Sequence, residues 1–147
     1  MGSAQAVGAD FVEAFNAHDE DRIRRLNAEN AVFEAPGDVR VEGREGATQY
    51  AMAWLNAFPD ARLNVKNELV AGDWVVQEFT FEGTHEGTLY GPAGEIPATN
   101  RRLSGRGVQI FRVEGDAVAD TRLYFDQVEI LTQLGLNPQP LPPKDPA

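Results

Sequence analysis

Apolar side chains in the N-terminal part of the chain recur at spacings of three and four residues, which is the pattern of an amphipathic helix. The pattern predicts a helix over residues 5–17, a short second helix that Asp19 or Asp21 can cap, and a third helix over residues 44–58. Pro59 ends the third helix, because proline cannot continue the helical hydrogen bonds. The apolar stripe of this third helix is rich in aromatic residues and consists of Tyr50, Ala51, Trp54, Leu55 and Phe58.

From residue 61 onward the period of the apolar positions changes to two, as in strands that bury one face. Gly72 and the segment 114–116 are turn signals that divide this region into hairpins. The last strand leads into a short helix over residues 127–134, for which Gly135 is the expected end. The pattern predicts strands over residues 31–35, 39–41, 61–69, 74–82, 103–113 and 117–126. The strand predicted over residues 74–82 places four residues on one face, namely Val75, Gln77, Phe79 and Phe81.

Helices followed by consecutive strands predict an α+β fold with an antiparallel sheet, since a parallel sheet needs helices between its strands. We expect the aromatic helices to cover a curved sheet and to enclose a pocket. Residues 1–136 are expected to form a single domain. Residues 137–147 contain five prolines in eleven residues, which favours an extended C-terminal tail.

Charge and composition narrow the possible functions. The 147-residue chain has a formal net charge of −10, which repels nucleic acid and anionic lipid surfaces, so we expect neither as a partner. No apolar run approaches the roughly 20 residues of a membrane span, and no secretory signal is visible, so we expect a cytoplasmic protein. The chain has no cysteine and two histidines, so we expect no metal site. Any catalysis must use carboxylates, hydroxyls, amides, arginines or one histidine.

Six short segments occur in an order and spacing that resemble a known family. They are residues 15–19, 58–60, 83–85, 97–101, 111–116 and 124–135. The chain resembles the SnoaL-like polyketide cyclases of the nuclear-transport-factor-2-like, or ketosteroid-isomerase-like, superfamily. The resemblance implies a cone-shaped, curved, antiparallel or mixed sheet wrapped by the N-terminal helices. It also implies an intramolecular aldol ring closure without any cofactor, in which an aspartate at the end of the final long strand is acid and base. Asp126 is the matching position.

Asp126 and His85 are therefore the candidate catalytic residues. If Asp126 faces an apolar cavity, desolvation raises its pKa toward the range that a general acid or base needs. Its alternative role is to cap the helix that follows. His85 titrates nearest neutrality and could hold a substrate oxygen or share a proton with a carboxylate. Its alternative is a structural histidine bonded to a loop carbonyl.

Several further side chains are candidates for substrate binding. Gln109 and Arg106 lie on the penultimate strand, where an amide or a guanidinium could bind an enolate oxygen. Their spacing places them on opposite faces, so at most one of them lines a cavity. Aromatic residues could stack on a polycyclic substrate, although at helical or strand spacing they are also ordinary core residues. The aromatic candidates are Tyr50, Trp54, Phe15, Phe33, Phe79 and Tyr124.

The leading hypothesis is a cyclase or isomerase that moves a proton next to a carbonyl of a hydrophobic, polyketide-like small molecule. One alternative is a domain of the same fold that only binds a small molecule or dimerises. Another is an enzyme that adds water to an epoxide, for which Asp120, Arg122 and Asp126 share one strand face. Because an open sheet of this architecture exposes one face, we also expect a homodimer.

Overall fold

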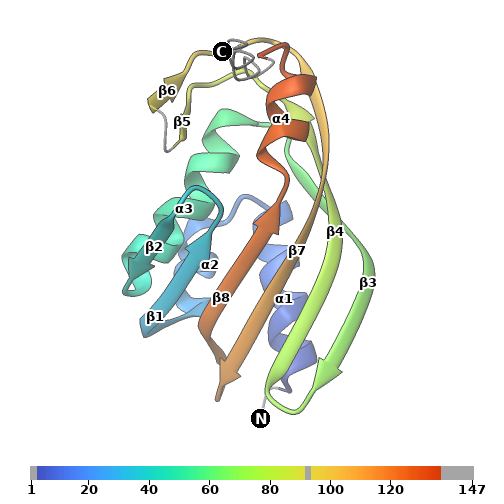
Figure 1. The fold of residues 1–147 in the computed structure, drawn as a ribbon. Helices are drawn as coiled ribbons and strands as arrows, with labels where there is room; N and C mark the ends of the chain where they lie inside the picture. The colour runs from blue at the N-terminus through green and yellow to red at the C-terminus, as the bar shows by residue number, and fades with distance from the viewer. Residues whose placement is uncertain (1–2, 92–93, 137–147) are drawn as a thin grey trace, which may run out of the picture.

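The computed structural model describes residues 3–91 and 94–136, so the proline-rich tail over 137–147 lies outside the described residues. Three helices lie together against one face of a curved sheet, and a fourth helix follows the last strand (Figure 1). The helices are α1 (Ala4–Asn16), α2 (Glu20–Leu26), α3 (Arg44–Ala57) and α4 (Gln127–Gln133). The strands are β1 (Asn27–Ala35), β2 (Val39–Glu42), β3 (Arg62–Ala71), β4 (Trp74–Thr84), β5 (Leu89–Gly91), β6 (Gly94–Ile96), β7 (Arg102–Glu114) and β8 (Ala117–Phe125).

Six strands form the main sheet in the order β2-β1-β8-β7-β4-β3, and β5 pairs with β6 in a separate hairpin. All neighbours in the main sheet are antiparallel except β1 and β8, which run parallel. Gly72 and Gly115 turn the two long hairpins with φ of 58° and 61°, a left-handed conformation that glycine adopts without steric cost. The pairing of the last two strands around Gly115 confirms the hairpin that the sequence predicted.

The helices begin where the sequence supplies caps. The Ser3 hydroxyl accepts the N–H of Ala6 at 3.0 Å at the start of α1, and Asp19 accepts the N–H of Arg22 at 3.1 Å at the start of α2. The buried side of α1 carries Val7, Phe11, Ala14 and Phe15, which are the apolar positions of its sequence pattern. Local capping and apolar spacing thus account for both helices.

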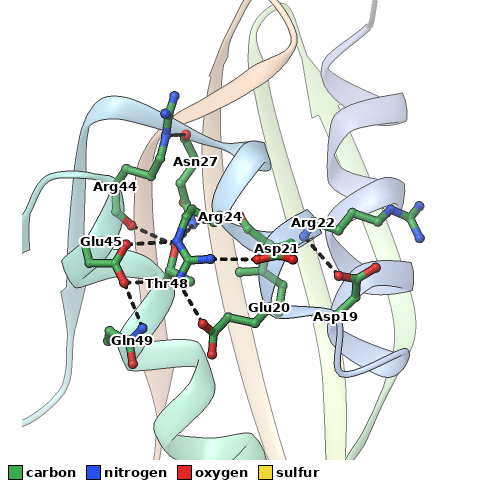
Figure 2. Close-up of polar contacts among 11 residues, drawn as sticks. Asp19, Glu20, Asp21, Arg22, Arg24, Asn27, Arg44, Glu45, Thr48 and Gln49 are labelled. Carbon is green, nitrogen blue, oxygen red and sulfur yellow. Dashed lines mark hydrogen bonds and ion pairs between the residues drawn. The ribbon is translucent and has the colours of Figure 1, made fainter.

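A polar network joins α2, α3 and the start of β1 (Figure 2). The guanidinium of Arg24 binds both carboxylate oxygens of Glu45, at 2.9 and 3.1 Å, and also reaches Glu20 at 2.8 Å. The buried side chain of Asn27 donates to the Ile23 carbonyl at 3.2 Å and to the Thr48 hydroxyl at 3.4 Å. These contacts fix the orientation of α3, the helix that carries Tyr50 and Trp54.

The α+β architecture with a curved mixed sheet and covering helices is the fold that the sequence predicted. Two elements differ from the prediction. β1 begins at Asn27, four residues before the predicted strand, because the polar bonds of Asn27 and a register shift against β8 accommodate a segment without apolar alternation. Of the predicted loop around residues 90–94, Tyr90 and Gly91 belong to β5 and Gly94 to β6, whereas residues 92–93 lie outside the described residues. Among the described helices, none combines the length and apolar character that a membrane span requires.

Candidate active site

An apolar cavity lies between the helices and the concave face of the sheet. Phe11 and Phe15 of α1 close one side and Tyr50 and Trp54 of α3 the other, while the strands supply the floor. The free volume inside is about 70 Å³, which is room for a few water molecules or a small part of a ligand. The complete lining consists of Phe11, Phe15, Phe33, Tyr50, Ala51, Trp54, Leu63, Phe79, Phe81, Leu103, Gly105, Arg106, Gln109, Leu123, Phe125 and Ile130.

The aromatic walls hold one another in place. The indole of Trp54 stands edge-on to the rings of Phe81 and Phe125, with both centroid distances 5.5 Å. The rings of Phe33 and Tyr50 lie 4.3 Å apart and are tilted by 39°. Aromatic contacts such as the two edge-to-face pairs of Trp54 stabilise a defined arrangement of the rings that line the cavity.

A second cavity of about 170 Å³ adjoins the first beneath the β5–β6 hairpin. The two cavities share four lining residues, which are Tyr50, Trp54, Phe125 and Ile130. The hairpin contributes Leu89, Tyr90 and Ile96 to the second cavity, and α4 contributes Leu131. A ligand larger than the first cavity therefore has neighbouring apolar space to occupy.

None of the described residues that line the first cavity is an aspartate, glutamate or histidine. Apart from Arg106, its polar side chains are those of the half-buried Tyr50 and the buried Gln109. Burial raises the pKa of the Tyr50 phenol above its usual value. A tyrosine phenol is protonated at neutral pH and can donate a hydrogen bond. Among the described residues, no cluster of three or more histidines, cysteines or carboxylates could hold a metal ion.

Gln109 belongs to a row of polar residues on the same face of three adjacent strands. Glu68 of β3 pairs with Gln77 of β4, and Gln77 pairs with Gln109 of β7. The Gln109 amide donates to the Gln77 amide oxygen at 2.8 Å, and the Gln77 amide donates to the Glu68 carboxylate at 3.1 Å. The side chains of Gln77 and Gln109 are buried. Their hydrogen bonds therefore connect the partly exposed carboxylate of Glu68 to the apolar cavity.

Asp126 is exposed and lies outside the cavity lining. One of its carboxylate oxygens accepts the N–H groups of Val128 and Glu129, at 2.9 and 3.2 Å, as the N-cap of α4. The carboxylate borders a groove on the outer face of the sheet instead. The carboxylate therefore lacks apolar surroundings, and the helix-cap alternative describes this geometry.

His85 is fully buried beyond the end of β4 and is also absent from the cavity lining. Its ring stacks on Phe58 with the centroids 5.2 Å apart, and its Nδ1 accepts the N–H of Thr99 at 3.2 Å. Burial lowers the pKa of His85, and a smaller opposing effect comes from the backbone of Gly87. The surroundings favour the structural alternative, with hydrogen bonds that join His85 to Thr99.

The other predicted substrate-binding residues divide between the two faces of the sheet. Gln109 lines the cavity, as do Tyr50, Trp54, Phe15, Phe33 and Phe79. Arg106 touches the edge of the cavity, but its side chain is 81% exposed and binds Glu129 at 3.2 Å. Tyr124 is 55% exposed and borders the outer groove, so it does not line the apolar cavity, and its role in substrate binding stays a prediction.

The arrangement considered for water addition does not form in this structure. Asp120 is bound by the guanidinium of Arg112 at 2.7 Å. The guanidinium of Arg122 lies over the Trp74 ring, 5.8 Å from its centroid. Neither residue lines the cavity, so these groups do not converge with Asp126 on one water molecule.

Sequence reasoning missed the contribution of Gln77 and Glu68, although one signal was available. Gln77 occupies the apolar phase of its strand between Val75 and Phe79, and a polar residue at such a position requires a buried partner. It also missed Leu123 and Phe125, because both faces of the last strand are mixed in character and its orientation could not be assigned.

Comparison with known proteins identifies relatives over most of the chain. A family model described as SnoaL-like polyketide cyclase matches residues 6–134. The aklanonic acid methyl ester cyclases DnrD of Streptomyces peucetius and DauD of Streptomyces sp. strain C5 are each 34% identical over 94 residues, or 63% of this chain. The matched part spans 61% and 55% of those two proteins, respectively.

Solved structures support the fold. A SnoaL-like protein from Jannaschia sp. CCS1 superposes with a TM-score of 0.80 at 21% identity, covering 92% of this chain and 93% of its own. A protein with a ketosteroid isomerase-like fold from Catenulispora acidiphila gives a TM-score of 0.73 at 15% identity, with 88% and 92% covered. At these identities the similarity establishes the architecture alone.

Proposed function

Because the chain belongs to the SnoaL-like polyketide cyclase family, we propose that it closes a ring in, or isomerises, a hydrophobic carbonyl compound by proton transfer without a cofactor. The observation that carries the proposal is the aromatic cavity that is also lined by one buried amide, that of Gln109. Apolar walls with few polar groups are typical of small-molecule sites, in which the polar groups orient the ligand.

The proposed reaction is an intramolecular aldol addition. A carbon next to one carbonyl loses a proton, the resulting carbanion attacks a second carbonyl carbon, and the new alkoxide receives a proton. One carbon–carbon bond forms, and the product is an isomer of the substrate. The fixed aromatic walls would hold the two reacting carbons close together, which is a large part of what a ring closure requires.

Tyr50 is the group best suited to stabilise the oxyanion. It borders both cavities, and its phenol is protonated at neutral pH and able to donate a hydrogen bond. A donor aimed at developing negative charge in a site from which water is excluded stabilises the transition state strongly. For Asp126, the role of acid and base rests on the family resemblance, whereas its cap geometry supports a structural role.

A second candidate function is ligand binding without catalysis. It is favoured by the absence of carboxylates and imidazoles from the lining of the first cavity, since a general acid or base must reach the proton that it moves. A binder would take up the same hydrophobic molecule and return it unchanged.

Aklanonic acid methyl ester is a rational first probe, because it is named in the two curated relatives. We expect the protein to convert it to a product of unchanged mass and different retention time in liquid chromatography coupled to mass spectrometry. Saturable binding of the ester with no product would support the binder, and the absence of binding would exclude this ester as the ligand.

Gly105→Val tests whether the cavity is the site. A Cβ at this position would have Ile130 Cγ1 as its nearest neighbour at 3.7 Å, so the valine fits the backbone and fills cavity space. Ser104→Val adds the same side chain to the adjacent, exposed position and is the matched control. Conversion that survives Gly105→Val would exclude the cavity as the reaction site.

A further inference from the structure

The polar row formed by Glu68, Gln77 and Gln109 is unusual for the cavity face of a sheet. Gln77 is fully buried and Gln109 is 5% exposed, and their neighbours along the strands include Val75, Phe79 and Phe111. Burying amides among apolar groups is costly unless every strong hydrogen-bonding group finds a partner. The row therefore constrains how each amide is oriented.

The carboxylate of Glu68 sets that orientation. An ionised carboxylate only accepts hydrogen bonds, so Gln77 must turn its NH₂ toward Glu68, and they are 3.1 Å apart. The Gln77 oxygen then points to the other side, where it accepts the Gln109 NH₂ at 2.8 Å. Reversing either amide would bring like atoms together, with two donors or two acceptors in contact.

Two contacts from α1 hold this row in place. The side chain of Gln5 donates to the second oxygen of Glu68 at 3.3 Å. Gly8 lies so close above Gln77 that a Cβ there would be 3.1 Å from the Gln77 amide nitrogen. The helix thus covers the buried amides, and the polarity set at Glu68 reaches Gln109 through a packed path.

The direction of these hydrogen bonds determines how Gln109, at the cavity end of the row, is oriented. With its NH₂ bound to Gln77, Gln109 turns its amide oxygen away from that partner, and the residue lines the cavity. Resting on the proposal that the cavity is the substrate site, we infer that Gln109 accepts a hydrogen bond from a hydroxyl of the substrate. Glu68 and Gln77 are its positioning residues.

The hydrogen bond proposed here has the opposite direction to the one expected from the sequence, in which the amide of Gln109 would donate to an enolate oxygen. The substrate class is a hydrophobic ring system with a phenolic or enolic hydroxyl, and the oxyanion is left to Tyr50. A ligand without the hydroxyl leaves a buried acceptor unsatisfied, which corresponds to a loss of affinity of roughly 5- to 150-fold.

The test compares three probes of similar shape, 1-naphthol, naphthalene and 1-tetralone, by isothermal titration calorimetry with the full chain. We expect 1-naphthol, the hydroxyl donor, to bind at least about 5-fold more tightly than the other two. Gln109→Leu should remove this preference while naphthalene still binds.

Glu68→Gln is the decisive variant, because an amide can accept or donate and so no longer fixes the direction of the row. Although residue 68 is absent from the cavity lining, the preference for 1-naphthol over 1-tetralone should shrink toward one. Glu78→Gln makes the same change at an exposed site on β4 and should leave the preference intact.

The outcomes separate this inference from the proposed function. Probes that bind with no hydroxyl preference, or with a preference that Glu68→Gln leaves unchanged, would overturn the inference while leaving the cavity as the site. Binding that survives Gly105→Val, or no binding of any probe, would overturn both.

Discussion

Replacing Asp126 by asparagine separates its two possible roles more clearly than any other single substitution in this chain. Asparagine keeps the size and one acceptor oxygen of aspartate, but it cannot take up or release a proton at accessible pH. In the structure, one oxygen accepts two N–H groups of α4, at 2.9 and 3.2 Å, and the side chain is exposed. We therefore expect turnover to stay within a few-fold of the wild-type value.

The expected change in stability follows from the same contacts. Asparagine caps a helix about as well as aspartate, so the main loss is that of a negative charge at the helix N-terminus, about 0.3–1 kcal/mol. Asp126→Ala also removes the cap and should cost about 0.5–2 kcal/mol in free energy of unfolding. For a domain of this size, each 1 kcal/mol corresponds to a shift of about 2–4 °C in Tm.

Thermal denaturation and single-turnover kinetics on the converted substrate measure the two quantities independently. A general acid or base typically contributes 10²- to 10⁴-fold in rate. A loss of that size in the asparagine variant, with Tm nearly unchanged, would refute the reasoning from the cap geometry and make Asp126 the catalytic residue.

Three further predictions follow from particular contacts. Gly105→Val should abolish binding of ligands to the cavity with little change in Tm, whereas Ser104→Val should leave affinity intact; equal affinities measured by calorimetry would contradict the assignment of the cavity. Burial lowers the pKa of His85 in the folded chain. The stability that neutral His85 contributes is therefore complete above the pKa of the unfolded chain, about 6.5, and it is lost as the pH falls through the pKa of the folded chain. Urea denaturation of His85→Gln should therefore depend less on pH below about 6.5 than the wild type does, and parallel curves would exclude this contribution. We propose a homodimer formed through the outer face of the sheet, where Leu69 is 61% and Tyr124 55% exposed. Sedimentation at micromolar concentration should give a dimer that Leu69→Lys weakens, and a wild-type monomer would rule it out.

The sequence alone determined most of the secondary structure, because the signals for it are local. The apolar spacing and the Asp19 cap define the second helix, and Gly72 and Gly115 mark the turns of the long hairpins. The change of period from about four to two distinguishes helices from strands without any knowledge of their partners.

Only the tertiary structure decided which groups face the cavity. The sequence around Asp126 is the same whether this residue caps α4 or enters the pocket. In the structure it caps α4 and lies outside the cavity lining. The parallel pairing of β1 with β8 joins strands far apart in the sequence, so no local signal could predict it.

The polar row depends on tertiary structure most strongly of all. Gln77 and Gln109 are 32 residues apart in the sequence, and their amides meet only because β4 and β7 pair in one register. A shift of either strand by one residue would turn its amide to the opposite face of the sheet, and the two amides would no longer meet. The sequence thus determined the residues of the candidate site, because side-chain chemistry is local. Strand register determined their orientation, because the pairing of distant strands is set by the packing of the whole domain.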